Sequence, residues 1–528
     1  MPELPVTLTL ALPPELADLV RVARIQERAR AVMDVEGKRL LDLLGLPGAP
    51  VVTIEVGETG GAWGRVFVND VRCRFADTLG QQAWALVFGT QVQLSAPLIP
   101  QLAGLVRERP DELTEWLKLA VSGVLAGHPA ALLNEAQTGA YASELGVPVD
   151  VQRLRRVLSG ALRLGVSVRD RARIADGLAE HSHAPPEEVV EALLPVLATE
   201  RLRLRMPNAS LRQLLTEDPD VAGRYASMRS FMLQERGLDL PRLGVVPDLD
   251  LAPGHFAVSL NAVPLLPWPG LGQGECLVAE PVERTRGREV SIEGVAPHPA
   301  YGYLCDRIRA TSRSAVEAGG ASVWTGAEYV WRVLREELLR RSWWLVDRST
   351  VRSALLRVSV GYPALLALVQ ERIPETQLAM TMRTLAQEGV SVRNMQIILE
   401  QLLDAPVDSD LSIGDIRHAL ARSIAAGHTT DQGAIEAFVL APELEELLRP
   451  TADCDLSELP EPVADRLLAA LRAGAEGSTL APCLLTTTQL RPALQALVAN
   501  ELPRVAVISY DDLPAATPVQ ASRIAFAG

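Results

Sequence analysis

The sequence predicts a helix-rich α+β fold made of two tandem copies of one module, each a small mixed sheet plus a helical subdomain, and a C-terminal βαβ subdomain. The pentapeptide GVSVR occurs at residues 165–169 and again at 389–393, and apolar residues at helical spacing flank both copies. Residues 202–215 and 438–448 share a second pattern, a short strand followed by a capped helix, which we interpret as the common end of the two copies. Residues 483–509 alternate strand, helix and strand, which is typical of a βαβ crossover.

These patterns set the predicted domain borders in a chain of 528 residues, which is long enough for several cores. A degenerate first copy covers residues 1–216, and a fuller second copy covers 217–449. The second copy holds an inserted small subdomain at about 265–325 and a helical subdomain at about 360–449, whereas the first copy is shorter between its strands and its long helices. Residues 450–528 form the C-terminal subdomain.

The first copy begins with a helix or helix pair over residues 16–44. Residues 51–56 and 65–75 alternate in polarity like strands, and Asn69 with the following Asp is a plausible turn between short arms. A long helical region then runs over residues 110–145. The sequence therefore predicts a small sheet followed by helices.

Two helices joined by the GVSVR segment are the clearest element in each copy, at residues 151–178 and 378–404. In the second copy, Gly389 is expected to end the first helix in a left-handed conformation, and Ser391 to cap the next helix. That next helix has apolar residues at helical spacing: Met395, Ile398, Leu399, Leu402 and Leu403.

The rest of the second copy mirrors the first. A helix at 222–236 precedes a strand at 256–260, which ends at a turn on Asn261, as the first-copy strand ends at Asn69. A helical region follows at 327–358.

The C-terminal subdomain is expected to begin with a helix at 460–475. Strands at 483–486 and 505–509 flank a helix at 489–502, so the two strands should be parallel. Residues 519–527 are a candidate edge strand.

Composition limits the classes of function that this chain can have. Apolar residues make up 48% of the chain and charged residues 22%, as in an ordinary folded protein. The net charge of −14 argues against a general nucleic-acid or anionic-membrane binder, and lysine occurs only at Lys38 and Lys118. The cysteines are odd in number and form no CxxC pair, which favours reduced, buried thiols in a cytosolic protein: Cys73, Cys276, Cys305, Cys454 and Cys483.

No stretch of the sequence has the pattern of a transmembrane helix. The longest uncharged run, residues 79–106, is interrupted by glutamines and by Pro97 and Pro100, and its WALVF core at 84–88 is better interpreted as a strand. The N-terminus lacks the basic segment of a signal peptide.

Motifs for catalysis, metal binding or cofactor binding are weak, so we predict no catalytic residue, no metal and no cofactor. His181 and His183 could ligate a metal with neighbouring glutamates, but no third His or Cys stands at ligand spacing, and a loop is the better interpretation. The GLGQGE segment at 270–275 imitates a dinucleotide fingerprint without a helix after it. No GxSxG elbow occurs.

The paired helices could also be a helix-turn-helix that binds nucleic acid. Such an element would use these residues: Arg393, Asn394 and Gln396, and in the first copy Arg169, Arg171 and Arg173. The acidity of the chain disfavours this hypothesis. A stripe of tryptophans is better interpreted as core or subunit interface than as a ligand box: Trp324, Trp331, Trp343 and Trp344.

Several motifs, in this order, resemble the cytoplasmic domain of the flagellar and type III secretion export-gate family (FHIPEP). They are VAPHPAYGYLCDRI, the helix through Tyr329 to Leu339, LAQEGVSVRNMQIILEQLLD, IRHALARSI, LAPELEELL and CLLTTTQLRPALQALVANELPRVAVISYDDLP. The resemblance covers about 217–528 well and 16–216 more faintly.

The resemblance implies a non-enzymatic scaffold under the membrane export gate. In the family this domain forms a nonameric ring, receives chaperone–substrate complexes and helps to switch export between substrate classes. We therefore expect export-apparatus proteins as partners, a homo-oligomeric ring, and a cytoplasmic location that is peripheral at the inner membrane through the export complex. Family members also carry an N-terminal membrane domain, and no such domain is expected in this chain, which has a duplicate module instead.

The family's chaperone-docking dimple has an Asp and a Phe in a DPAF-like motif and a Thr on a following helix. Aligned without gaps, these positions fall on His298, Tyr301 and Arg332. Tyr301 keeps an aromatic anchor, but His298 and Arg332 change charge and volume, and a lost charged hydrogen bond would cost about 1.5–3 kcal/mol. Docking of ordinary flagellar chaperones is thus in doubt.

The leading hypothesis is a duplicated, export-gate-like scaffold or docking component that works by binding partners. The alternative is a repurposed stand-alone interaction or regulatory protein, with nucleic-acid binding through the paired helices as one form of it.

Overall fold

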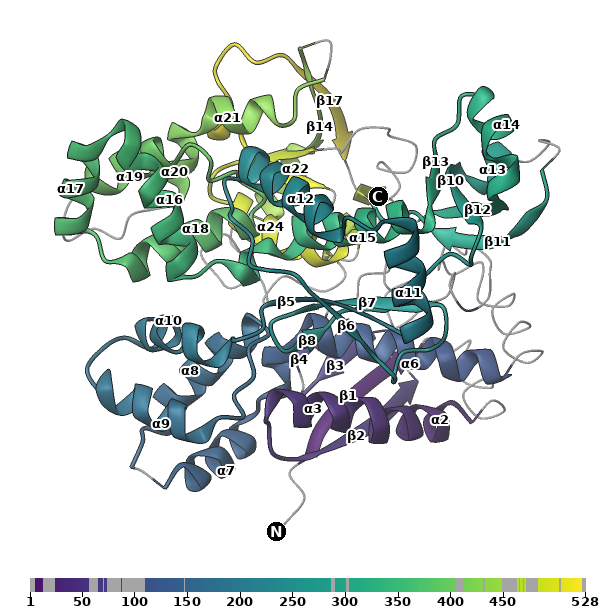
Figure 1. The fold of residues 1–528 in the computed structure, drawn as a ribbon. Coiled ribbons are helices and arrows are strands. Elements are labelled where there is room, and N and C mark those ends of the chain that lie inside the picture. The colour runs from purple at the N-terminus through teal and green to yellow at the C-terminus, as the bar shows by residue number, and fades with distance from the viewer. Residues whose placement is uncertain are drawn as a thin grey trace. The chain divides into compact units, whose positions relative to one another are not determined.

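The computed structural model divides the chain into two compact units (Figure 1). Residues 1–228 with 241–339 form the first unit, and residues 229–240 with 340–528 form the second. Among the described residues, no helix is both long and apolar enough to cross a membrane. The structure describes residues 5–12, 24–56, 65–69, 71–73, 87, 110–146, 148–285, 290–300, 303–404, 413–430, 433–448, 463–464, 466–468, 470–471, 483–502 and 505–524.

The first sheet has the order β2-β1-β3-β4, from β1 (Pro5–Leu12), β2 (Ala49–Val56), β3 (Arg65–Val68) and β4 (Val71–Cys73). Strand β1 pairs parallel with β2 and antiparallel with β3. Asn69, at φ 48°, makes the predicted turn between β3 and β4. Strand β1 was not predicted, although apolar and polar residues alternate in its sequence VTLTLAL, as in a half-buried strand.

A helical segment joins β1 to β2. It consists of α2 (Ile25–Val32), a π-helical turn η2 (Met33–Gly37) and α3 (Lys38–Leu44), which ends at Gly45 with φ 77°. This agrees with the predicted helix at 16–44 over its described part. Its buried residues include Val32, Met33, Leu40, Leu41 and Leu44.

Helices follow the first sheet in sequence, and the first predicted helix pair is α8 and α9, joined at Gly165 with φ 65°. The strand predicted at 84–88 lies outside the described residues apart from Val87. The helices are α6 (Pro110–Gly127), the 3₁₀ turn η4 (Pro129–Leu132), α7 (Glu135–Leu145), α8 (Val151–Arg163), α9 (Arg171–Glu180) and α10 (Pro186–Leu197).

The second sheet repeats the strand order of the first as β6-β5-β7-β8. Strand β5 pairs parallel with β6 and antiparallel with β7, and Asn261, at φ 52°, lies in the turn between β7 and β8. The strands are β5 (Leu202–Met206), β6 (Gly244–Pro247), β7 (His255–Leu260) and β8 (Val263–Pro264), and the short β9 (Trp268–Pro269) pairs with β7.

Two helices lie between β5 and β6 in sequence, α11 (Asn208–Glu217) and α12 (Val221–Arg236). The N-terminus of α11 follows Pro207 and has no side-chain cap, so the predicted cap is wrong there. Because β5 pairs with β6 and β7, a border at 216/217 separates β5 from its own sheet.

A third, antiparallel sheet occupies most of the stretch expected to be inserted at about 265–325. Its order is β11-β12-β10-β13, from β10 (Glu275–Pro281), β11 (Ile292–Pro297), β12 (Leu304–Arg309) and β13 (Val323–Thr325). The short helices α13 (Val282–Thr285) and α14 (Arg313–Ala318) accompany it, and its core contains Cys276, Val278, Ile308, Val316, Ala321 and Val323.

Helices dominate the first half of the second unit. Helix α18 ends before Gly389, which has φ 75° as predicted. Ser391 does not cap α19, because that helix begins only at Met395; the Ser391 hydroxyl accepts from the N–H of Arg393 at 3.4 Å and donates to the carbonyl of Glu235. The elements are α15 (Gly326–Arg341), which spans both units, the 3₁₀ turn η6 (Ser342–Leu345), α16 (Arg348–Gly361), α17 (Pro363–Arg372), α18 (Glu375–Gln387), α19 (Met395–Asp404), α20 (Ile413–Ala419) and α21 (Ala421–Ala426).

The last sheet is wholly parallel, in the order β16-β15-β14-β17. The predicted parallel crossover is therefore confirmed, and β17 is the predicted edge strand. Strand β14 also belongs to this sheet, so the sheet is not confined to 450–528. The elements are β14 (Ile435–Leu440), α22 (Pro442–Leu448), β15 (Cys483–Thr486), α24 (Arg491–Glu501), β16 (Ala506–Ser509) and β17 (Val519–Ile524); of the helix predicted at 460–475, the described residues between 463 and 471 are helical.

A buried ion network joins this sheet to the helices of the second unit. The guanidinium of Arg417 lies 2.7 Å from Asp512 and 3.0 Å from Glu388, and Arg491 lies 3.0 Å from Glu388. Arg417 has 1% of its side chain exposed, so the charges are paired out of water.

The first GVSVR loop, at residues 165–169, docks on the end of α3. The N–H of Val168 donates to the carbonyl of Leu44 at 2.7 Å, and the hydroxyl of Ser167 donates to the carbonyl of Leu43 at 2.8 Å. Gly45 follows immediately and turns the chain away from the loop.

The second GVSVR loop, at residues 389–393, makes the same contacts at the end of α12. The N–H of Val392 donates to the carbonyl of Arg236 at 2.9 Å, and the hydroxyl of Ser391 donates to the carbonyl of Glu235 at 2.7 Å. Gly237, at φ 74°, takes the place of Gly45.

The cysteines that the structure describes are free and buried, as expected. Burial raises the pKa of Cys73 and of Cys483 to about 12, so these thiols stay protonated at neutral pH.

Candidate docking site

Helix α15 is fixed at its N-terminus by two independent contacts. Thr325 and Glu328 form reciprocal hydrogen bonds between side chain and backbone, which is the capping-box pattern expected from the sequence TGAE. The carboxylate of Glu217, on α11, accepts from the N–H of Ala327 at 2.9 Å. Because the start of the helix is held this way, the position of Arg332 farther along α15 is set as well.

The turn between β11 and β12 carries His298. The backbone N–H of His298 donates to the carbonyl of Tyr303 at 2.8 Å. The backbone N–H of Ala300 donates to the ring nitrogen Nδ1 of His298 at 3.2 Å. Since Nδ1 accepts here, the ring proton of neutral His298 is on Nε2. The hydroxyl of Tyr329, on α15, donates to the carbonyl of Pro297 at 2.9 Å and ties this turn to the helix.

Two of the three site residues predicted from the resemblance, His298 and Arg332, both lie against Trp324. The ring centroid of His298 lies 5.1 Å from that of Trp324, and the guanidinium carbon of Arg332 lies 4.4 Å from the centre of the same indole. Tyr303 stacks on His298 at 4.9 Å. We call His298, Tyr303, Trp324 and Arg332 the Trp324 cluster. Tyr301 lies outside the described residues.

The Trp324 cluster is suited to binding a protein surface. His298 is 7% exposed and Trp324 9%, so the rings form a rigid base, whereas Arg332 is exposed to solvent. A guanidinium that lies over the face of an indole can still donate to a carboxylate or a carbonyl. Sequence reasoning placed Trp324 among tryptophans of a core or a subunit interface, because no pattern showed which side chains its ring would meet.

The other tryptophans are packed, in line with their interpretation as core. Trp331 is 5% exposed and donates through Nε1 to Asp218 at 2.9 Å. Trp344 is 3% exposed and meets Trp343 edge to face at 5.9 Å.

The weaker motifs take ordinary structural roles. His181 and His183 lie in the turn between α9 and α10, and no group of three His, Cys, Asp or Glu residues suited to a metal occurs in the described part of the chain. The glycines at 270–274 lead into strand β10 instead of a helix, so the dinucleotide pattern has no structural basis.

The first-copy arginines proposed for a DNA groove are partly committed to the fold. The guanidinium carbon of Arg171 lies 3.8 Å from the ring centre of Tyr141, and its nitrogens bind Glu144 at 3.1 Å. Burial of the ring raises the pKa of Tyr141 above its usual value. Arg171, on α9, therefore ties that helix to α7.

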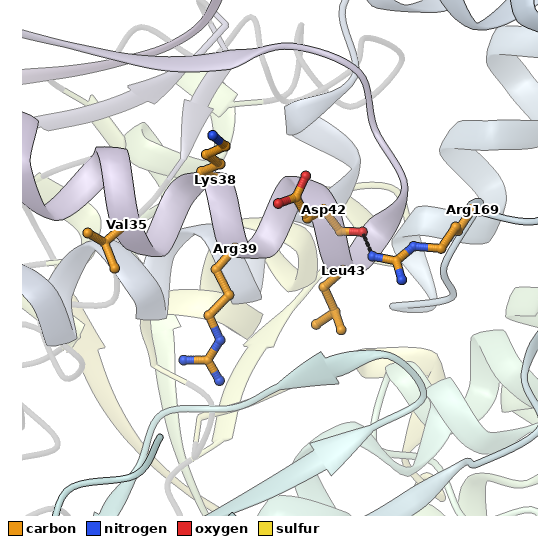
Figure 2. A pocket seen from close by; sticks show the side chains of 6 residues that line it. All are labelled: Val35, Lys38, Arg39, Asp42, Leu43 and Arg169. Carbon is orange, nitrogen blue, oxygen red and sulfur yellow. Dashed lines mark hydrogen bonds between the residues drawn. The ribbon is translucent and has the colours of Figure 1, made fainter. Parts of the chain in front are cut away.

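A surface hollow of about 340 Å³ lies beside α3 (Figure 2), and no motif in the sequence pointed to it. Arg169, from the GVSVR loop, donates to the main-chain oxygen of Asp42 at one end. The lining residues are Val35, Lys38, Arg39, Asp42, Leu43 and Arg169.

Comparison with known proteins decides the family. The model described as the FHIPEP family matches residues 182–518. The chain belongs to the FHIPEP family. The match starts at residue 182, in the turn before α10, and ends at residue 518, immediately before β17.

Curated relatives carry secretion and flagellar names. The hypersensitivity response secretion protein HrcV of Ralstonia nicotianae is 24% identical over 66% of this chain and 52% of its own length. The flagellar biosynthesis protein FlhA of Yersinia enterocolitica is 28% identical over 56% of this chain and 43% of its own length. The chain thus spans about half the length of the curated relatives it matches.

Solved structures share the fold. The CdsV protein of Chlamydia pneumoniae superposes with a TM-score of 0.53 at 22% identity, over 61% of this chain and 96% of that one. A complex of CdsV with CdsO from the same organism gives a TM-score of 0.52 at 21% identity, over the same shares of the two chains.

Proposed function

We propose that this chain is a docking component of a flagellar or type III protein export apparatus, which works by binding partner proteins and performs no catalysis of its own. The match of the family model to residues 182–518 carries this proposal. The secretion and flagellar names of HrcV and FlhA agree with it, and CdsV is itself known in complex with a second protein. The proposed location is cytoplasmic, at the inner membrane through the other export proteins.

The proposal includes an internal duplication. Its support is that the two mixed sheets share one strand order and that each hairpin turns on an asparagine with positive φ. In addition, a four-residue 3₁₀ turn and then a capping box, at Asn134 and at Asp347, precede the helices α7 and α16. Because β5 begins the second sheet, we place the border near residue 200 instead of 216.

We propose the Trp324 cluster, together with Tyr301, as the docking surface for export chaperones and their substrates. Its support is the alignment of His298, Tyr301 and Arg332 with the family's docking dimple and the packing of His298 and Arg332 on one indole. Because Arg332 adds a positive charge, the partner should present a carboxylate opposite it. A partner fitted to the family's Asp and Thr should bind poorly.

Co-purification tests the export role. Full-length chain with an affinity tag, expressed in its native cells, is expected to enrich export-apparatus proteins over a tag-only control. Recovery of none of these proteins would overturn the proposal. Recovery of salt-sensitive nucleic acid instead would favour the alternative, a regulator that binds through its paired helices.

We also propose that the chain assembles into a ring through copies of itself. Size-exclusion chromatography with light scattering on the full chain measures this directly. A mass that rises with concentration toward a closed oligomer is expected, and a strictly monomeric mass at high concentration would contradict ring assembly.

A further inference from the structure

The hollow beside α3 has a lining that the fold itself does not require. Val35, Arg39 and Leu43 are spaced four residues apart and form one stripe on the helical segment, while Lys38 and Asp42 form the adjacent stripe. Arg169 closes one end (Figure 2). The hollow therefore combines two apolar side chains, Val35 and Leu43, with three cations and one carboxylate.

The second copy supplies an internal control for these residues. Counting back from Gly45 and from Gly237, Lys38 corresponds to Ser230 and Arg39 to Phe231. The second-copy loop nevertheless makes the same hydrogen bonds to its helix end. The cations of the first copy are thus not needed to hold the GVSVR loop in place.

The charges around the hollow are available at its surface. Lys38 is exposed and makes no ion pair with any residue that the structure describes. Arg39 has 40% of its side chain exposed and reaches Glu36 and Asp250 only at 3.6 and 4.0 Å. Such long, exposed pairs contribute little, so a ligand carboxylate can compete for Arg39.

Apolar side chains in the hollow are exposed as well. Val35 has 63% of its surface open to solvent, although it lies on a helix whose opposite face is buried. A helix from a partner protein buries residues of this kind when it packs along a stripe spaced by four.

From these features we infer that the hollow binds an acidic amphipathic helical segment of a partner protein. Leucine-like side chains of the segment would cover Val35 and Leu43, and its carboxylates would face Lys38, Arg39 and Arg169. The apolar side chains and the Asp42 carboxylate make the lining a poor match for nucleic acid or for a small inorganic anion, both of which need cations or N–H donors throughout. The inference is independent of the Trp324 cluster and of any role in export.

Fluorescence anisotropy on the full-length chain tests it. The probe is a labelled helical peptide of about fifteen residues with leucine on one face and glutamate on the other, and the matched peptide has glutamine for glutamate. Wild-type protein is expected to bind the acidic peptide at least about tenfold more tightly than the glutamine peptide, with an affinity that falls as salt is added.

Charge reversal locates the site. The double variant Lys38→Glu with Arg39→Glu should lose about tenfold or more in affinity, while Arg393→Glu, at the second-copy position of Arg169, should bind as the wild type does. Equal affinity of all three proteins would overturn the inference, as would tighter binding of an oligothymidine than of the peptide. Displacement of the peptide by millimolar phosphate would instead indicate a small-anion site and would also overturn it.

A folding check keeps the result interpretable. If thermal unfolding shows that the double variant is not folded, Lys38→Gln replaces it, because Lys38 makes no ion pair within the described residues. A several-fold loss of affinity is expected for Lys38→Gln, and an unchanged affinity overturns the inference.

Discussion

Arg417 is the most deeply buried charged residue among the described residues of the second unit. It is held between Glu388, which follows α18, and Asp512, in the turn after β16. Asp512 also accepts from the N–H of Ser509 at 2.7 Å, so the carboxylate is satisfied from both sides. Removing the arginine would leave carboxylates in a site with little water, and that cost far exceeds the value of an exposed ion pair.

Replacing Arg417 with Met should therefore lower the unfolding free energy of the second unit by about 3–5 kcal/mol. Arg352→Met is the matched control, because Arg352 pairs with Glu375 while 64% of its side chain is exposed, and its loss should cost less than about 1 kcal/mol. Denaturant-dependent hydrogen exchange in β15 and β16 measures both. Similar costs for the two variants would show that the buried network does not hold the last sheet.

His428 gives the second unit a pH dependence. Burial, with Arg236 and Arg417 nearby, lowers the pKa of His428 below its ordinary value of 6.5. The unfolded chain therefore binds a proton first as pH falls through 6.5, and the folded state loses stability from there down to the lower folded pKa. Unfolding midpoints measured between pH 7.5 and about 5 should fall less in His428→Asn. An equal decline in both proteins would assign the effect to other groups.

At the scale of elements, the joint between paired helices is where sequence and structure agree most closely. The glycine of GVSVR has a positive φ after α8 and after α18. This conformation was predicted, because the glycine follows directly after a run of apolar residues at helical spacing. The role of the serine was mispredicted, because α19 begins four residues after Ser391, and the Ser391 hydroxyl donates instead to the carbonyl of Glu235, far away in the sequence. Local patterns cannot show such a partner.

The glycine that ends the receiving helix should be the least replaceable residue of the joint. A Cβ on Gly237 would lie 2.3 Å from the backbone nitrogen of Arg393, so Gly237→Ala combines left-handed strain with a clash. Gly389→Ala is the control, because it has the same strain at φ 75° but nothing within 4 Å of its Cβ.

Thermal or chemical unfolding of the two variants measures the difference in their free energies of unfolding. Gly389→Ala should cost about 1–2 kcal/mol from backbone strain alone. Gly237→Ala should cost clearly more, and equal costs would mean that the loop yields to the added methyl group without loss.

Strands were harder to predict than helices. Residues 5–12 alternate in polarity, yet β1 pairs with two strands that lie well beyond it in sequence, and nothing local marks that pairing. The same limit explains why β5 and β14 were interpreted as the ends of copies. Each instead forms a parallel pair with a later strand, β6 and β15 respectively.

At the scale of the whole molecule, the order of motifs identified the family, but it could not predict which side chains meet in the candidate docking site. His298 and Arg332 were named by alignment, whereas Trp324, which contacts both, was assigned to a core. The hollow with Lys38 and Arg39 was missed, because its lining comes from two segments far apart in sequence. Surfaces formed by such distant segments need the structure.

The Trp324 cluster offers the most direct test of a docking role. Biolayer interferometry would titrate export chaperone–substrate complexes from the same organism against immobilised full-length chain, as wild type, as Arg332→Glu and as Arg212→Glu. Arg212 is an exposed arginine on α11 and serves as the charge-matched control. We predict that the wild type and Arg212→Glu bind alike and that Arg332→Glu loses about tenfold or more. Binding of no complex, or equal binding by all three proteins, would contradict a docking function at this surface.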